Sequence, residues 1–201
     1  MIKENFIELL EKSIKENWNY KAFTDYNGKT FTYAEIAERI EFLHKFFKKC
    51  DLKIGDKVAL MGKNSSSWGI VYIGVVTYGA VIVPILPDFH SNDVHHIVNH
   101  SDSQLLFTND NIWDELDETE MPDLKAICSL NDFSVKYRKD SKIEKAFLDS
   151  KKLYDQIKGH LRADDIKYAK IKNSDLASIV YTSGTTGFSK GVMLPANSLA
   201  S

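Results

Sequence analysis

Apolar residues recur with helical spacing in two segments of the N-terminal quarter. The first stripe has one apolar residue every four positions: Phe6, Leu10, Ile14 and Trp18. The second stripe follows a Thr32/Glu35 pair: Ile36, Ile40, Leu43 and Phe47. Charged residues between the apolar ones predict an amphipathic helix for each stripe. Thr32 and Glu35 have the spacing of a capping box, so we expect the second helix to begin directly after Thr32.

A short hairpin is expected between these two helices. Asn27 and Gly28 separate residues 22–24 from residues 29–31, and both flanking runs are rich in β-formers. Asn-Gly tolerates the positive φ angles of a tight hairpin turn. Residues 1–55 are therefore predicted to form helix, hairpin and helix.

Residues 56–130 alternate between short β-rich runs and helical patterns. The expected strands are 56–61, 81–83, 104–108 and 125–128. The expected helices begin at Asn64 or Ser65, at Ser91 or Asn92 (ending at His100), and near Asn111 (ending near Leu116). Such alternation is typical of an α/β fold with a parallel sheet flanked by helices.

The stretch 65–87 contains no charged residue, so a membrane span has to be considered. Gly74, Gly79, Pro84 and Pro87 would interrupt it repeatedly. A buried helix that turns at Gly79 into a buried parallel strand explains the same residues better. We therefore expect no transmembrane span.

Residues 131–172 are rich in lysine and aspartate. We expect a helical excursion on the surface, with Phe147, Leu148 and Leu153 as its buried points. A solvated face is favoured over a binding patch.

Overall composition limits the function classes. The 201 residues carry a net charge of −2, which gives no electrostatic case for binding nucleic acid or an anionic membrane. Cys50 and Cys128 have neither metal-site nor redox-motif spacing, which favours a reducing, cytoplasmic compartment. Residues 1–18 lack the apolar core of a signal peptide.

Four histidines lie close together, which raises the possibility of a metal site: His90, His95, His96 and His100. Zinc would need further ligands converging from elsewhere, and the spacing alone does not supply them. We expect a partly exposed helix that carries histidines, and no metal site.

The strongest chemical signal lies near the C-terminal end, between the apolar runs 176–180 and 192–194. Its glycines are Gly184, Gly187 and Gly191. Its hydroxyl side chains include Thr182, Ser183, Thr185 and Thr186. Glycine lets the backbone come close to a ligand, and exposed N–H groups, hydroxyls and the ammonium of Lys190 together suit a polyphosphate. A Walker loop requires Ser or Thr after the lysine and then a helix, whereas Gly191 and a β-rich run follow here. We expect strand, loop and strand; an ordinary hairpin loop is the alternative.

The string YTSGTTGFSKGVML resembles the phosphate-loop signature of the adenylate-forming superfamily, which includes acyl-CoA synthetases, peptide-synthetase adenylation domains and luciferases. Residues 31–36, 64–68 and 78–84 also resemble acyl-CoA synthetase segments, so the likeness extends over most of the chain. Members usually have proline where this chain has Ser189. They often have histidine and asparagine where Ala196 and Ser198 stand. The chain looks most like a long-chain fatty-acid–CoA ligase.

The resemblance implies an ATP-dependent ligase. A carboxylic acid, here a fatty acid, attacks the α-phosphorus of ATP, pyrophosphate leaves, and coenzyme A takes the acyl group from the adenylate. The β- and γ-phosphates, together with Mg²⁺, would be held by the loop residues Thr182, Ser183, Gly184, Thr185, Thr186, Gly187 and Lys190. Lys190 would have the catalytic part, stabilising the charge that grows on the leaving phosphates.

The resemblance also implies one incomplete domain over residues 1–201, the front portion of a larger AMP-binding domain. Its parts are 1–55, the alternating region 56–130, the excursion 131–172 and the phosphate-loop hairpin 173–201. The acyl pocket and the C-terminal domain would lie beyond Ser201, so we expect the chain to be inactive alone. Sheet edges left open could support oligomers. Two alternatives stay open: a nucleotide- or protein-binding module without catalysis, and an amino-acid-adenylating domain.

Overall fold

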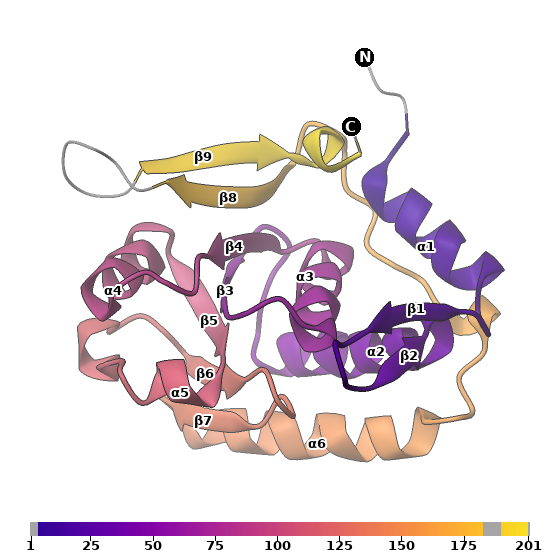
Figure 1. Cartoon of the computed structure of the whole chain (residues 1–201), viewed down its shortest axis with the longest axis horizontal. Helices are drawn as coiled ribbons and strands as arrows, with labels where there is room; N and C mark the ends of the chain where they lie inside the picture. Colours follow the sequence, from indigo (N-terminus) through magenta and orange to yellow (C-terminus); the bar gives the residue numbers. More distant parts are fainter. Residues whose placement is uncertain (1–3, 183–189, 201) are drawn as a thin grey trace.

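A seven-stranded sheet organises the protein, whose computed structural model describes residues 4–182 and 190–200 (Figure 1). The strand order is β7-β6-β5-β3-β4-β8-β9. The strands are β3 (Lys57–Met61), β4 (Val81–Ile85), β5 (Ser103–Thr108), β6 (Ala126–Ser129), β7 (Val135–Arg138), β8 (Leu176–Thr182) and β9 (Lys190–Pro195). Neighbours pair in parallel from β6 to β8, whereas β7 and β9 pair antiparallel at the two edges. The predicted α/β class with a mainly parallel sheet is confirmed.

Helices cover both faces of this sheet. The α-helices are α1 (Phe6–Glu16), α2 (Tyr33–Lys49), α3 (Ser66–Tyr78), α4 (Ser91–His100), α5 (Asp110–Trp113) and α6 (Ser141–Ile157). Short 3₁₀ turns are η1 (Glu118–Glu120), η2 (Ala163–Asp165) and η3 (Ala196–Leu199). A separate two-stranded sheet joins β1 (Lys21–Thr24) and β2 (Thr30–Thr32). In Figure 1, α2, α3 and α6 gather on one side of the strands, and α4 lies near the far end of the β8–β9 hairpin.

Two hydrophobic cores lie on opposite faces of the sheet. Successive residues of β3 alternate between them, with Leu60 in the core that contains α2 and α3, and Ala59 and Met61 in the core that contains α4. Phe107 and Leu106 of β5 divide in the same way. Strands buried on both faces explain why these segments read as continuous apolar runs.

Local signals place most element boundaries where they were expected. The Thr32 hydroxyl accepts from the Glu35 N–H at 3.2 Å, and the Glu35 carboxylate accepts from the Thr32 N–H at 2.8 Å, which completes the capping box. Ser65 caps α3, and Gly79 ends it with φ +85°, a left-handed conformation that favours glycine. Asn27, with φ 52°, forms the predicted hairpin turn. The helix expected over 111–116 is shorter, because α5 ends at Trp113.

The interpretation of 131–172 as a purely helical surface excursion is wrong in two respects. Residues 135–138 form the edge strand β7, paired with β6 through Ala126↔Arg138 and Ile127↔Tyr137. In addition, α6 buries Ile143, Ala146 and Ser150, whereas Leu148 is 48% exposed. The buried positions follow the i, i+3, i+7 spacing of one helix face, and Leu148 lies outside that face. Phe147 and Leu153 are half-buried.

The uncharged stretch 65–87 is accounted for by the buried α3 and β4, as expected. Across residues 4–182 and 190–200, none of the helices has the length and hydropathy that crossing a bilayer requires.

Candidate functional site

The glycine-rich segment joins two antiparallel strands. Tyr181 pairs with Gly191, and Thr182 pairs with Lys190, so Thr182 and Lys190 form the last pair of the β8–β9 hairpin before the connecting residues 183–189. Both residues are exposed. The prediction that a strand, and not a helix, follows the lysine is confirmed. The other predicted phosphate ligands, Ser183, Gly184, Thr185, Thr186 and Gly187, lie outside the described residues.

The pair next to Thr182 and Lys190, Tyr181 with Gly191, is closely packed. A Cβ atom on Gly191 would lie 3.0 Å from Ile179 Cγ2 and 3.1 Å from Tyr181 Cζ, so a larger residue there would require these side chains to shift. Ile179 and Tyr181 are buried in the core that contains α4. The residue next to Lys190, Gly191, is therefore closely packed against Ile179 and Tyr181.

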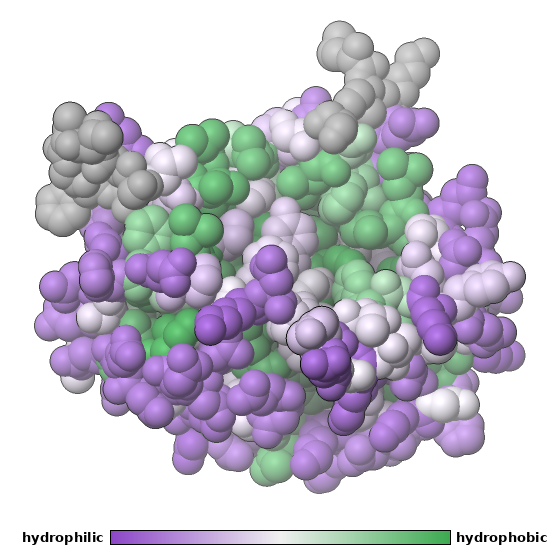
Figure 2. All heavy atoms as spheres, viewed as in Figure 1, coloured by the Kyte–Doolittle hydropathy of each residue, from purple (hydrophilic) through white to green (hydrophobic). Residues whose placement is uncertain are grey.

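Strand β9 exposes apolar side chains on both of its faces, because its neighbouring residues Val192 and Met193 point to opposite sides. Val192 is 48% exposed and Met193 is 66% exposed, and β9 is the last strand of the sheet order. Figure 2 shows hydrophobic atoms gathered along the upper part of the molecule, where Figure 1 places β8, β9 and β4, above a largely hydrophilic lower part. Exposed apolar patches of this kind mark contact surfaces.

The strand order points to a second position where a ligand could be considered. In open α/β sheets, ligands bind beyond the carboxyl ends of the strands where the strand order reverses, which here is between β3 and β5. Asn109 follows β5 there and contacts the segment that follows β3. Its Oδ1 accepts from the Lys63 N–H at 3.2 Å and would lie 2.6 Å from a Cβ atom on Gly62. We take the β8–β9 hairpin as the candidate site, because Thr182 and Lys190 are both exposed there.

The clustered histidines have structural partners. His95 is buried, and its Nε2 accepts from the Asp117 N–H at 3.1 Å. The Nδ1 atom of His100 is hydrogen-bonded to the Tyr181 hydroxyl at 2.7 Å. The rings of His96 and His100 are 5.4 Å apart. Within the part of the chain that the structure describes, no three His, Cys, Asp or Glu side chains converge on a possible metal position.

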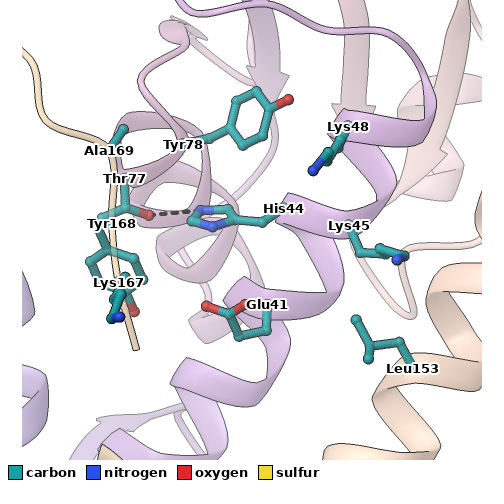
Figure 3. Close-up of a pocket in the computed structure, with 10 residues that line it drawn as sticks. All are labelled: Glu41, His44, Lys45, Lys48, Thr77, Tyr78, Leu153, Lys167, Tyr168 and Ala169. Atoms are coloured by element: carbon teal, nitrogen blue, oxygen red, sulfur yellow. Dashed lines mark hydrogen bonds between the residues drawn. The ribbon is translucent and has the colours of Figure 1, made fainter. Parts of the chain in front are cut away.

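A cavity of about 370 Å³ lies away from the hairpin, and Figure 3 shows its lining residues. They come from α2, α3, α6 and residues 167–169, and none comes from β8 or β9. His44 lies in its middle, with Nε2 at 3.0 Å from Gly74 O and 3.1 Å from Thr77 Oγ1. A carbonyl oxygen can only accept, so Nε2 carries a proton. Burial lowers the pKa of His44 to about 4.

This pKa predicts an acid-sensitive fold. Unfolded His44 titrates near 6.5 and folded His44 near 4, so the unfolded state binds more protons between these values. The free energy of unfolding should therefore fall as pH decreases from 6.5 to 4, by at most about 1.4 kcal/mol per pH unit from this group.

His44→Gln is the matched variant, since its amide can keep a donor near Nε2 but does not titrate. Urea denaturation at several pH values should show a flatter profile for this variant than for the wild type. Burial also raises the pKa of Glu41, which opposes the trend at acidic pH in both proteins, so the difference between them isolates His44. Parallel profiles would contradict the assignment.

Comparisons with known proteins agree with this geometry. A family model described as "AMP-binding enzyme" matches residues 10–201. The long-chain-fatty-acid–CoA ligase of Escherichia coli O157:H7 is 25% identical over 206 residues, covering 95% of this chain and 36% of the relative. Long-chain-fatty-acid–CoA ligase 6 of Mus musculus is 27% identical over 170 residues, covering 81% of this chain and 24% of the relative. Surfactin synthase subunit 2 of Bacillus subtilis (strain 168) is 26% identical over 192 residues, covering 96% of this chain and 5% of the relative.

The fold recurs in a solved structure, the anthranilate CoA ligase AuaEII in complex with anthranoyl-AMP, with a TM-score of 0.77 and 17% identity over 96% of this chain and 35% of that one. The chain spans from 5% to 36% of the length of these relatives. Because the family model covers nearly the whole chain, including the β8–β9 hairpin, this protein belongs to the AMP-binding enzyme family of adenylate-forming enzymes.

Proposed function

We propose that this chain is the front portion of an ATP-dependent acyl-CoA synthetase that activates a carboxylic acid, preferably a fatty acid, as its adenylate and transfers the acyl group to coenzyme A. The supporting observation is the β8–β9 hairpin, in which Thr182 and Lys190 pair with each other next to the connecting residues 183–189. The fatty-acid–CoA ligases of Escherichia coli and Mus musculus favour this acid and this acceptor.

In this proposal, the chain's own residues bind the departing end of ATP. Lys190 provides an ammonium at the start of β9, and Thr182 provides a hydroxyl opposite to it. Ser183, Gly184, Thr185, Thr186 and Gly187 are proposed to add hydroxyls and backbone N–H groups. These donors face the phosphates on which negative charge develops, which stabilises the transition state more than the ground state. Mg²⁺ would accompany the ATP phosphates, and no described residue is assigned to Mg²⁺ or coenzyme A.

ATP–pyrophosphate exchange in the complete gene product tests the function. We expect exchange that depends on a fatty acid, and acyl-CoA formation when coenzyme A is added. Exchange that depends on an amino acid would instead favour an amino-acid-adenylating domain, the alternative supported by the surfactin synthase match. Binding of MgATP with no exchange for any acid would favour a non-catalytic module.

We further propose that residues 1–201 form one part of a larger AMP-binding domain and make no acyl-CoA by themselves. Acyl-CoA formation by the isolated chain would contradict this. A cytoplasmic location is also proposed, because Cys50 and Cys128 are both buried and unbonded, as is usual in reducing compartments.

The isolated chain is expected to self-associate through β9. A strand at a sheet edge can pair with a second copy, and Met193 adds exposed apolar surface beside that edge. Met193→Lys should lower the association measured by sedimentation equilibrium. Leu86→Lys is the control, since Leu86 is 62% exposed but lies outside the strands. A wild-type chain that stays monomeric at its highest soluble concentration would contradict the proposal.

A further inference from the structure

A hydrogen bond connects α4 to the strand that leads into the phosphate loop. His100 is the last residue of α4, and its Nδ1 lies 2.7 Å from the hydroxyl of Tyr181. The two rings are nearly perpendicular, with centroids 5.8 Å apart. Tyr181 directly precedes Thr182, so this contact lies one residue from the proposed site.

The Tyr181 side chain is held from two sides. Its hydroxyl is hydrogen-bonded to His100, and its Cζ atom lies 3.1 Å from the position that a Cβ atom on Gly191 would take. Gly191 is adjacent to Lys190 in β9. A continuous series of contacts therefore runs from α4 through Tyr181 to the backbone of the residue next to Lys190.

The backbone of β8 pairs with β4 on one side and with β9 on the other. Among the described residues, the parallel pairing of β8 with β4 has one register pair, Ile82 with Ser178. Tyr181 lies three residues further along, beyond that pair. Here β8 is joined to β9 by the antiparallel ladder, and the side chain of Tyr181 is joined to α4 by His100.

The hydrogen bond between His100 and Tyr181, called the tether below, does not require the Tyr181 hydroxyl to lose its proton. Burial and the charge of Asp102 raise the pKa of Tyr181, so its hydroxyl stays protonated at neutral pH. A phenol hydroxyl can donate to a neutral imidazole and can accept from an imidazolium, so the hydrogen bond does not require one protonation state of His100. The neighbouring ring of His96 limits the space available to His100.

We propose that His100 is a positioning residue for adenylate formation, acting through Tyr181 to hold the end of β8 and the start of β9 in place for the ATP phosphates. This inference rests on the function proposed above. Without the tether, the hairpin end must be ordered when ATP binds, so the loss should weaken ATP binding more than the chemical step.

Three variants separate the hydrogen bond from other effects. His100→Leu removes it, Tyr181→Phe removes it from the other side while keeping the ring, and His100→Asn keeps a polar atom near the position of Nδ1. His90→Leu is the matched control, because His90 is an exposed histidine at the opposite end of α4 and makes no side-chain capping bond.

Two measurements are made on these variants. In the complete gene product, His100→Leu and Tyr181→Phe should each raise the KM for ATP in pyrophosphate exchange by about 3- to 10-fold, with kcat changed less. Their combination should be no worse than either alone. His100→Asn should restore most of the loss.

In the 201-residue chain, hydrogen exchange should accelerate in residues 176–182 and 190–195 for the two disruptive variants and not for His90→Leu.

The outcomes distinguish this inference from the proposed function. Wild-type protein without exchange activity would refute the function, and hydrogen exchange would still decide whether the tether exists. If the wild type is active, an unchanged KM for ATP in His100→Leu would overturn the positioning role. Additive losses in the double variant, or equal losses in His90→Leu, would overturn it as well.

Discussion

Replacing Lys190 with alanine is expected to slow acid-dependent ATP–pyrophosphate exchange in the complete gene product by about 10- to 1000-fold. Lys190 is exposed at the first position of β9 and pairs with Thr182 across the hairpin. Its ammonium can meet the charge that develops on the leaving phosphates, and charge-assisted hydrogen bonds are the strong ones. Because that charge grows during the reaction, the loss should appear mainly in kcat.

The chain offers a closely matched control in Lys21. Lys21 is the exposed first residue of β1 and pairs with a threonine, Thr32, as Lys190 pairs with Thr182. It lies in the separate two-stranded sheet, away from the β8–β9 hairpin. Lys21→Ala should leave exchange within about twofold of the wild type. Equal rates for Lys190→Ala and Lys21→Ala would remove Lys190 from the proposed site.

Replacing Phe47 with alanine is expected to lower the free energy of unfolding by about 3–5 kcal/mol. Phe47 is fully buried on α2. Its ring meets Tyr78 of α3 at 5.4 Å and Phe107 of β5 at 6.2 Å between centroids, both edge to face. The truncation would leave a cavity where two helices meet the sheet, and close packing prevents it from collapsing fully.

Urea denaturation followed by circular dichroism measures this loss, and Leu148→Ala is the control. Leu148 is 48% exposed on α6, so its truncation should cost less than about 0.5 kcal/mol. The comparison also tests the corrected orientation of α6, since a buried Leu148 would make the two losses similar. Similar losses would thus contradict the packing described here.

Local chemistry explains why much of the fold was predictable. The capping box of Thr32 and Glu35, the Asn27-Gly28 turn and the left-handed Gly79 each depend on residues close in sequence. The β3, β4 and β5 segments were predictable because strands buried on both faces need continuous apolar runs. The strand β9 after Lys190 followed from Gly191 and the β-rich run behind it.

Contacts between distant segments explain what was missed. The sequence Val135-Lys136-Tyr137-Arg138 alternates apolar and cationic residues and could belong to a solvated surface, and its pairing with β6 makes it a strand. The orientation of α6 depends on which face meets α2, so Leu148 and Ile143 could not be ranked from composition. The histidine spacing indicated no partner for His100, whose partner in the structure is Tyr181, 81 residues away.

The sequence by itself determined the family, the order of most helices and strands and the chemical character of the segment around Lys190, because these follow from local spacing and from a long, specific motif. Only the tertiary structure decided that Val135–Arg138 joins the sheet as β7, that β9 lies at the sheet edge with exposed apolar side chains and that His100 of α4 is hydrogen-bonded to Tyr181 of β8. The physical reason is that packing and hydrogen bonding between segments depend on their positions in space, and no local pattern encodes those positions.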